Sequence, residues 1–374
     1  MQALWYVVED ADAYVRRGEL AMATKRYWQI FQIFKDIEDD QFDFHQYCVR
    51  KGTFRAYVNM MRYMDTLRSH PKYIRAAQAA VPILLKVHAD PSILKPPQEK
   101  ETEAERQRRE QAEARERAKA EAKAKKQAAL DAQKKKSGAK KGKGGEEQQP
   151  EEEAAKPIPD PDPKGEKLVR DEPLKRALDF VRPLEREAPR HVATWTLSFD
   201  VALARKKYLQ ALRAIQTAAS LDSAHPGVHE RVARLAALVP TLSSLPEQVS
   251  AAVKDGVDAL VPSSLEAYLS DYLQRHASKS VAHTVGAARA LHAVRGAAAA
   301  RDEVQSLLAG AIRDADVSSP CTLPAVKDAI ALANEIGADA KSLQEAGQAH
   351  FPRAFGGTPP PPPSSDESKV EVVD

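Results

Sequence analysis

Apolar residues recur at helical spacing through the first part of the chain. Two helices are indicated by apolar residues three or four positions apart: Leu4, Trp5, Val8, Ala11 and Val15 in one run, and Tyr27, Ile30, Phe31 and Phe34 in the next. Similar runs predict further helices from Phe54 to Leu67 and from Tyr73 to His88. Several prolines then end the pattern, which places a block of helical repeats at residues 1–97.

Residues 98–136 lose this apolar pattern. They are rich in Glu, Ala, Arg and Lys, which favour helices, and Leu130 is their one large apolar residue. Pairs such as Glu105 and Arg109 stand four positions apart in the stabilising order. Because no apolar seam runs at heptad spacing, we predict a single long charged helix rather than a coiled coil. Such a helix would extend on the order of 55 Å if it were continuous.

The rest of the chain alternates between simple and helical composition. Residues 137–170 consist mainly of Gly, Lys, Glu and Pro, which bury too little apolar surface to offset the entropy of ordering, so we predict a disordered linker. Helical runs separated by prolines return at residues 171–355, a predicted C-terminal helical repeat domain. The proline run and acidic end of residues 356–374 predict a disordered tail. The predicted fold class is therefore all-α.

Two segments match the tetratricopeptide repeat, a pair of antiparallel helices about 34 residues long. Small residues let the two helices approach closely, and larger side chains fill the crossing. A generic helical hairpin remains an alternative, but either unit stacks into an α-solenoid, which suits protein or peptide binding. The predicted packing positions are Ala11, Tyr14, Gly18, Ala23 and Tyr27 in the first segment, and Ala202, Tyr208, Ala211, Ile215 and Ala218 in the second.

Composition agrees with a helical protein. Hydrophobic residues make up 43% of the chain but aromatic residues only 6%, and the alternation typical of strands is scarce. Two cysteines, Cys48 and Cys321, are too few for a disulfide framework and fit a reducing compartment. No run of apolar residues is long enough to span a membrane, and early acidic residues argue against a signal peptide. We therefore expect a cytoplasmic protein with no membrane partner.

One cluster near the start of the chain could suggest a metal site. Asp43, His45 and Cys48 are close in sequence, but their spacing is not a zinc pattern and no second Cys/His pair is near. We interpret the cluster as structural, with neighbouring Phe42, Phe44 and Tyr47 as core anchors.

Two other segments were candidates for chemistry and fail on spacing. His225 and His229 do not form the HExxH arrangement, and His225-Pro226 favours a turn before a helix. The glycine-rich residues 138–145 lack the GxxxxGK[ST] pattern of a phosphate loop and have no strand before them. No context for a nucleophile stands out, so no catalytic, cofactor-binding or metal-binding residue is predicted.

The segment Asp39–Tyr73 carries the most specific sequence signal. It reads DDQFDFHQYCVRKGTFRAYVNMMRYMDTLRSHPKY, and it resembles a signature of the auxiliary subunit of the NatA N-terminal acetyltransferase complex. The preceding GELAMATKRYWQIF, the charged helix, and the later EPLKRALDFVRPL, RKKYLQALRAIQTAASLDSAHPGVHE and HFPRAF are also similar to that family, in the same order. Family members are much longer, so the chain corresponds to their C-terminal portion.

This resemblance implies a non-catalytic scaffold. The chain would position a catalytic acetyltransferase subunit, which itself binds acetyl-CoA, and would need no cofactor of its own. It would help to dock the complex on the ribosome for co-translational acetylation, and a small regulatory protein is an open further partner. The alternatives are a tetratricopeptide co-chaperone or general interaction scaffold, an enzyme in its own right, and an RNA-binding scaffold unrelated to acetylation.

A basic run at the end of the charged helix fits the ribosomal role. Nine lysines stand against one acid, Asp131, which leaves a charge of +8 before an acidic run at residues 146–153. A solvated charge run is the simpler alternative. Lysines without aromatic residues favour contact with the phosphates of duplex RNA. Because the resemblance implies docking on the ribosome, we predict that this RNA is ribosomal. The lysines are Lys123, Lys125, Lys126, Lys134, Lys135, Lys136, Lys140, Lys141 and Lys143.

Overall fold

The computed structural model describes residues 3–94, 160, 162–316 and 319–355. Every regular element in these residues is a helix, which confirms the all-α class, and none is long and apolar enough to cross a membrane. The helices are α1 (Leu4–Arg16), α2 (Leu20–Asp39), α3 (Gln41–Lys51), α4 (Phe54–Met64), α5 (Pro71–Ala89), α7 (Glu166–Arg170), α8 (Pro173–Glu187), α9 (Val192–Ala204), α10 (Tyr208–Leu221), α11 (Pro226–Leu238), α12 (Glu247–Leu260), α13 (Leu265–His276), α14 (Val281–Arg295), α15 (Ala297–Arg313), α16 (Leu323–Ile336) and α17 (Ala340–His350).

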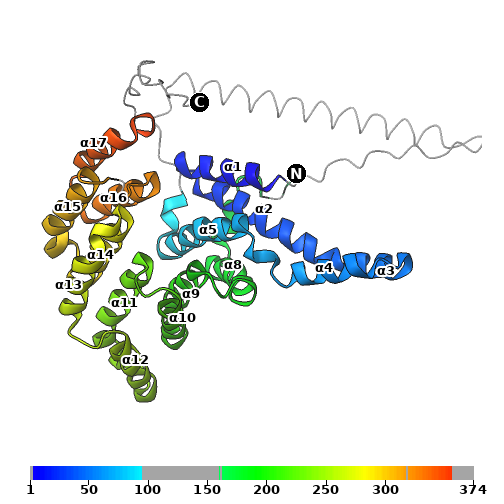
Figure 1. Cartoon of the computed structure of the whole chain (residues 1–374), viewed down its shortest axis with the longest axis horizontal. Helices are drawn as coiled ribbons and strands as arrows, with labels where there is room; N and C mark the ends of the chain where they lie inside the picture. The colour runs from blue at the N-terminus through cyan, green and yellow to red at the C-terminus, as the bar shows by residue number, and fades with distance from the viewer. Residues whose placement is uncertain (1–2, 95–159, 161, 317–318, 356–374) are drawn as a thin grey trace, which may run out of the picture.

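Short 3-10 turns join several of these helices. They are η1 (Leu67–Ser69), η2 (Pro91–Leu94), η3 (Val239–Ser244), η4 (Ala277–Lys279) and η5 (Pro352–Ala354). Figure 1 shows the helices following one another along a curved path, from α1 and α2 through α8 to α10 and on to α17. The predicted charged helix at residues 98–136 and the tail at 356–374 lie outside the described residues.

The first predicted repeat is formed by α1 and α2, which pack against each other. Ala11, Ala23 and Tyr27 are fully buried where the helices meet, and Tyr14 is half-buried beside them. Gly18 makes the turn with a φ of 76°, a conformation that glycine adopts without a steric penalty. The Tyr27 hydroxyl donates to Asp12, and both burial and this carboxylate raise the pKa of Tyr27.

The second predicted repeat is formed by α9 and α10. Lys206 occupies the turn with a φ of 57°, so a non-glycine residue adopts the left-handed conformation here. Tyr208 is half-buried at the start of α10. The remaining predicted packing positions are all buried: Ala202, Ala211, Ile215 and Ala218.

The two helical blocks share one core, although the long charged insertion separates them in sequence. Helix α8 packs against α5, and a single cluster of buried apolar residues extends from α1 to α9. Phe180 of α8 lies edge-on to Trp28 and Phe31 of α2, at centroid distances of 5.6 and 5.7 Å. The prediction of separate domains at residues 1–97 and 171–355 is therefore wrong at this boundary, because packing continues across the insertion.

A buried ion pair lies at the same junction. Arg68, in η1, donates from its guanidinium to Glu187 at 2.9 Å, and its backbone N–H donates to the same carboxylate at 2.8 Å. Both side chains are almost completely buried, and Arg68 also reaches Glu38 at 2.5 Å. The LRSHP segment is thus bonded to the C-terminal end of α8 by charge-assisted hydrogen bonds.

The end of the predicted linker is ordered. Helix α7 spans Glu166–Arg170, and Val169 is fully buried in the core formed with α2 and α5. Gly165 precedes it with a φ of 72°, and a side chain there would lie 2.7 Å from the carbonyl oxygen of Ala21. The prediction of disorder through residue 170 is therefore wrong at its end. The segment is polar on average, but one buried apolar residue, Val169, is enough to fix the end of the segment to the core.

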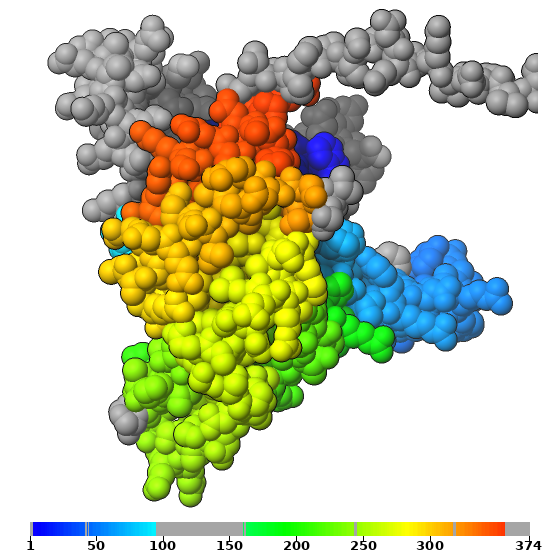
Figure 2. All heavy atoms as spheres, turned by 60° about the vertical axis from the view of Figure 1, so that its left-hand side comes forward, coloured from blue at the N-terminus to red at the C-terminus, as the bar shows by residue number. Residues whose placement is uncertain are grey.

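The helices from α11 to α17 form a column beside this core. Figure 2 shows them stacked from α12 at the bottom to α17 at the top, while the α3–α4 hairpin projects to one side. Helices α11 and α14 approach closely at Gly286, where an added Cβ would lie 2.5 Å from that of Pro226. A second apolar core runs through α13 to α17, and a third fills the space among α9 to α12.

Candidate protein-interaction site

Helices α3 and α4 form a hairpin that projects from the body of the solenoid. Figure 1 shows it leading away from the C-terminal end of α2, and its helices pack chiefly on each other. Gly52, with a φ of 69°, ends α3 and lets the chain reverse into α4. The hairpin falls within Asp39–Tyr73, the segment with the most specific sequence signal.

Polar contacts hold the two helices of the hairpin together. The Nδ1 atom of His45 lies 2.5 Å from the Tyr57 hydroxyl, and the side chain of Gln41 reaches the Met61 sulfur at 3.0 Å. Cys48 is buried in the hairpin. His45 and Cys48 therefore have structural surroundings, and within the described ranges no three His, Cys, Asp or Glu side chains are grouped as metal ligands.

The hairpin exposes large apolar side chains. No residue of α4 is buried, and Phe54 and Val58 lie four positions apart on one face with 58% and 44% of their surface exposed. The interpretation of Tyr47 as a core anchor is wrong, because half of its surface is exposed. Soluble proteins rarely leave large apolar side chains together on an exposed face unless another molecule covers them. The exposed apolar residues are Tyr47, Val49, Phe54, Val58 and Tyr63.

The same hairpin is cationic. Arg50, Lys51, Arg55 and Arg62 stand against Asp43 in residues 41–64, and all four cations are exposed. None of the four has an ion pair or a side-chain hydrogen bond within the part of the chain that the structure describes. Arginine beside aromatic residues is typical of the energetically important part of protein interfaces. The hairpin is therefore suited to a protein partner with an apolar and acidic surface.

The histidines of α11 have two different structural roles. The Nδ1 atom of His225 accepts a hydrogen bond from the backbone N–H of Gly227 at 3.1 Å and caps α11, as predicted for a turn before a helix. His229 is fully buried and stacks on Tyr272 at a centroid distance of 3.7 Å. Neither ring nitrogen of His229 has a hydrogen-bond partner among the described residues.

Acid is expected to destabilise the fold through His229. Burial, with a smaller contribution from His276, lowers the pKa of His229 to about 3, so the unfolded chain binds this proton first. Stability is therefore lost as the pH falls below about 6.5, by up to about 1.4 kcal/mol per pH unit until the folded-state pKa is reached. Urea denaturation at neutral pH and at about pH 5 measures this loss.

The variant His229→Phe should reduce the acid loss while keeping the stacking on Tyr272. Burial also lowers the pKa of His276 and His283, so part of the pH dependence should remain. The matched control is His88→Phe, at an exposed position on α5. Equal pH dependence in the wild type and His229→Phe would contradict this account.

The predicted ribosomal contact cannot be placed on the structure. The nine lysines from Lys123 to Lys143 lie outside the described residues, so their prediction rests on sequence alone. The structure does place the ten predicted repeat-packing residues in two helical pairs, α1–α2 and α9–α10. Sequence reasoning missed the exposed hairpin, although the spacing of Phe54 and Val58 was visible.

The fold and the exposed hairpin define an α-solenoid of the protein-interaction class. A model of the family described as "N-terminal acetyltransferase A, auxiliary subunit" matches residues 1–218, which is more than half of the chain. The chain belongs to this family. The match includes the first repeat, the hairpin and the junction between α5 and α8.

Curated relatives agree with this assignment. The chain is 33% identical over 309 residues to the N-terminal acetyltransferase A complex auxiliary subunit NAA15 of Arabidopsis thaliana, covering 78% of this chain and 32% of the relative. It is 38% identical over 294 residues to N-alpha-acetyltransferase 16, NatA auxiliary subunit, of Mus musculus, covering 78% and 34%. The chain thus spans about a third of the length of these relatives.

A solved structure described as Naa15/Naa10 bound to HypK-THB is also similar. The sequence identity is 29% and the TM-score is 0.48, over 69% of this chain and 29% of the solved one.

Proposed function

We propose that the chain is a non-catalytic auxiliary subunit that positions the catalytic subunit of N-terminal acetyltransferase A. Membership of the auxiliary-subunit family over residues 1–218 is the observation that carries this proposal. The catalytic partner would bind acetyl-CoA and carry out the transfer, while this chain supplies a rigid surface and no cofactor. A small regulatory protein is proposed as a further partner, and the cytoplasm as the location.

The α3–α4 hairpin is the proposed contact with the catalytic subunit. Its exposed aromatic and aliphatic side chains supply apolar area, and its cations supply selectivity for an acidic partner surface. Because the hairpin projects from the solenoid, a partner can contact both of its helices without disturbing the core. The solenoid behind it would act as the platform that fixes its direction.

The purified chain and the purified catalytic subunit test this proposal directly. Size-exclusion chromatography should show a complex with one copy of each protein, and the complex should acetylate substrate peptides from acetyl-CoA. Turnover by the chain alone would support the alternative of an enzyme in its own right. Failure of the two proteins to associate at micromolar concentration would reject the proposed function and favour a co-chaperone or a general scaffold.

We further propose that the basic run from Lys123 to Lys143 contacts ribosomal RNA. Sedimentation with ribosomes should show binding that weakens steeply as the salt concentration rises. Each phosphate contact adds about 0.7–0.9 to the slope of the logarithm of the binding constant against the logarithm of the salt concentration. Alanine at residues 134–136 should reduce both binding and slope, whereas alanine at the exposed Lys254, Lys279 and Lys327 should not. Unchanged binding after replacement of all nine basic-run lysines would reject the ribosomal contact.

A further inference from the structure

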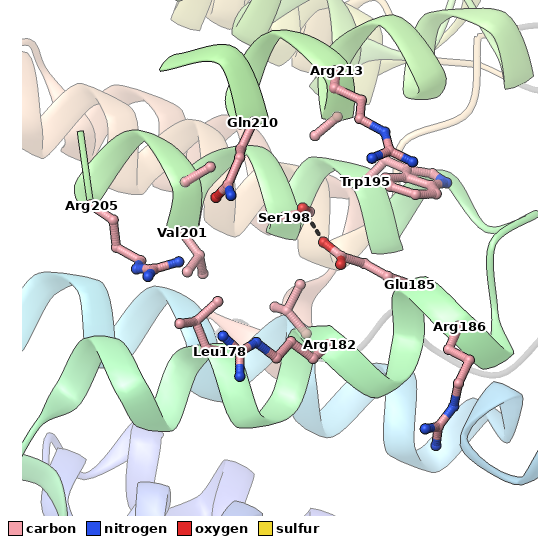
Figure 3. A pocket seen from close by; sticks show the side chains of 13 residues that line it. Leu178, Arg182, Glu185, Arg186, Trp195, Ser198, Val201, Arg205, Gln210 and Arg213 are labelled. Carbon is pink, nitrogen blue, oxygen red and sulfur yellow. Dashed lines mark hydrogen bonds between the residues drawn. The ribbon is translucent and has the colours of Figure 1, made fainter. Parts of the chain in front are cut away.

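A groove of about 460 Å³ lies among helices α8, α9 and α10. Figure 3 shows its lining, which combines apolar side chains with several arginines. Leu178, Val181 and Val201 line part of the groove with apolar side chains, and we call this part the apolar floor. Trp195 closes one end, and its ring is fixed by a hydrogen bond of 2.7 Å from Nε1 to the carbonyl oxygen of Pro189. The groove is therefore built on rigid elements, at a distance in sequence from the α3–α4 hairpin.

Three arginines of the groove form no salt bridge with any residue in the described part of the chain. Arg182 comes from α8, Arg205 from the end of α9 and Arg213 from α10. None of the three guanidinium groups has an ion pair or a hydrogen bond to any residue that the structure describes. Arg186 differs, because it is bonded to Glu187 at 2.7 Å and points away from the others in Figure 3. The groove therefore presents guanidinium groups that are available to a ligand.

One carboxylate lies inside this cationic groove. Glu185 accepts a hydrogen bond from the Ser198 hydroxyl, which holds it between the arginines in Figure 3. A compact polyphosphate would concentrate its negative charge close to this carboxylate, which repels it, and would leave the apolar floor uncovered. An extended peptide can instead direct acidic side chains to separate arginines and place aliphatic side chains on the floor between them. The arrangement therefore favours a peptide over a small polyanion.

We propose that the groove binds a short acidic segment of a partner polypeptide, with aliphatic residues between its acidic residues. Arg182 and Arg205 bind acidic side chains at one end of the segment, and Arg213 binds another near Trp195. The floor buries the intervening aliphatic side chains. This inference concerns a second surface of the auxiliary subunit and does not depend on the α3–α4 hairpin.

A fluorescein-labelled peptide of alternating glutamate and leucine tests the proposal by fluorescence anisotropy with the full chain. Each arginine that forms a charge-assisted hydrogen bond should contribute about tenfold in affinity. Alanine at Arg182 and Arg213 together should therefore weaken binding by about 100-fold. Arg313→Ala, which removes the same charge from an exposed position on α15, should leave binding unchanged.

A gain in affinity provides the sharper test, because misfolding cannot produce it. Among the described residues that line the groove, Glu185 is the one acid, so Glu185→Gln should increase the affinity for the glutamate–leucine peptide several-fold. Equal binding of a lysine–leucine peptide would overturn the proposal. Unchanged affinity in the double arginine variant, or displacement of the peptide by inorganic pyrophosphate at equal concentration, would also overturn it.

Discussion

The variant Glu187→Ala is expected to lower the free energy of unfolding by about 3–5 kcal/mol. Removal of this carboxylate deprives the Arg68 guanidinium of its buried counter-ion and leaves it only the partly exposed Glu38, and loss of one partner of a buried pair has a cost of this size. The Arg68 backbone N–H loses its acceptor as well. Urea denaturation measures the loss, and high salt should change it little because the pair is buried.

Two further variants separate the ion pair from general damage to the junction. Arg186→Ala removes a neighbouring arginine that is 69% exposed, and it should lower stability by less than about 1 kcal/mol. The double variant Arg68→Met with Glu187→Leu should recover most of the loss, because apolar replacements avoid a buried uncompensated charge. A loss in the double variant equal to the sum of the losses in Arg68→Met alone and in Glu187→Leu alone would show that the pair itself is not coupled.

The site of damage can also be observed. Because Arg68 and Glu187 lie on opposite sides of the insertion, Glu187→Ala should speed hydrogen exchange in both α5 and α8. Faster exchange in α8 alone would indicate that the two helical blocks are stabilised independently. The experiment therefore tests whether one core spans the insertion.

Helix positions could be predicted from the sequence because apolar spacing records which face of a helix is buried. Ala11, Ala23 and Tyr27 were identified in this way, and all three lie in the core between α1 and α2. Joining of the two blocks could not be predicted, since Phe180 and Glu187 meet partners more than a hundred residues earlier in the chain. The change in composition suggested a domain boundary between residues 1–97 and 171–355, but the apolar core continues across it.

The interaction surfaces were harder to predict, for a physical reason. The sequence spacing of apolar residues is the same whether their helix face is buried in the core or exposed to a partner protein. The exposure of Phe54 and Tyr47 could therefore not be predicted from the pattern. The arginine groove draws Arg182, Arg205 and Arg213 from three helices, and only folding brings them together. Membership of the auxiliary-subunit family, in contrast, was visible in the sequence of Asp39–Tyr73.

The double variant Phe54→Asp with Val58→Asp is expected to weaken association with the catalytic subunit by about 100-fold or more. These side chains lie on one exposed face of α4, and an aromatic anchor at an interface contributes about 2 kcal/mol or more. Two carboxylates would also oppose the acidic partner surface that the cationic hairpin favours. Isothermal titration calorimetry with the purified catalytic subunit measures the change.

Stability should hardly change in this variant, because surface substitutions outside the core alter it by about 0.5 kcal/mol or less. The matched control is Leu209→Asp with Leu221→Asp, which introduces the same charges at exposed apolar positions of α10. Equal weakening by the two double variants would mean that added negative charge, and not the hairpin, controls binding. Full binding by the hairpin variant would mean that the catalytic subunit binds elsewhere on the solenoid. Weaker binding in the hairpin variant, with unchanged binding in the α10 control, would identify α3 and α4 as the contact with the catalytic subunit.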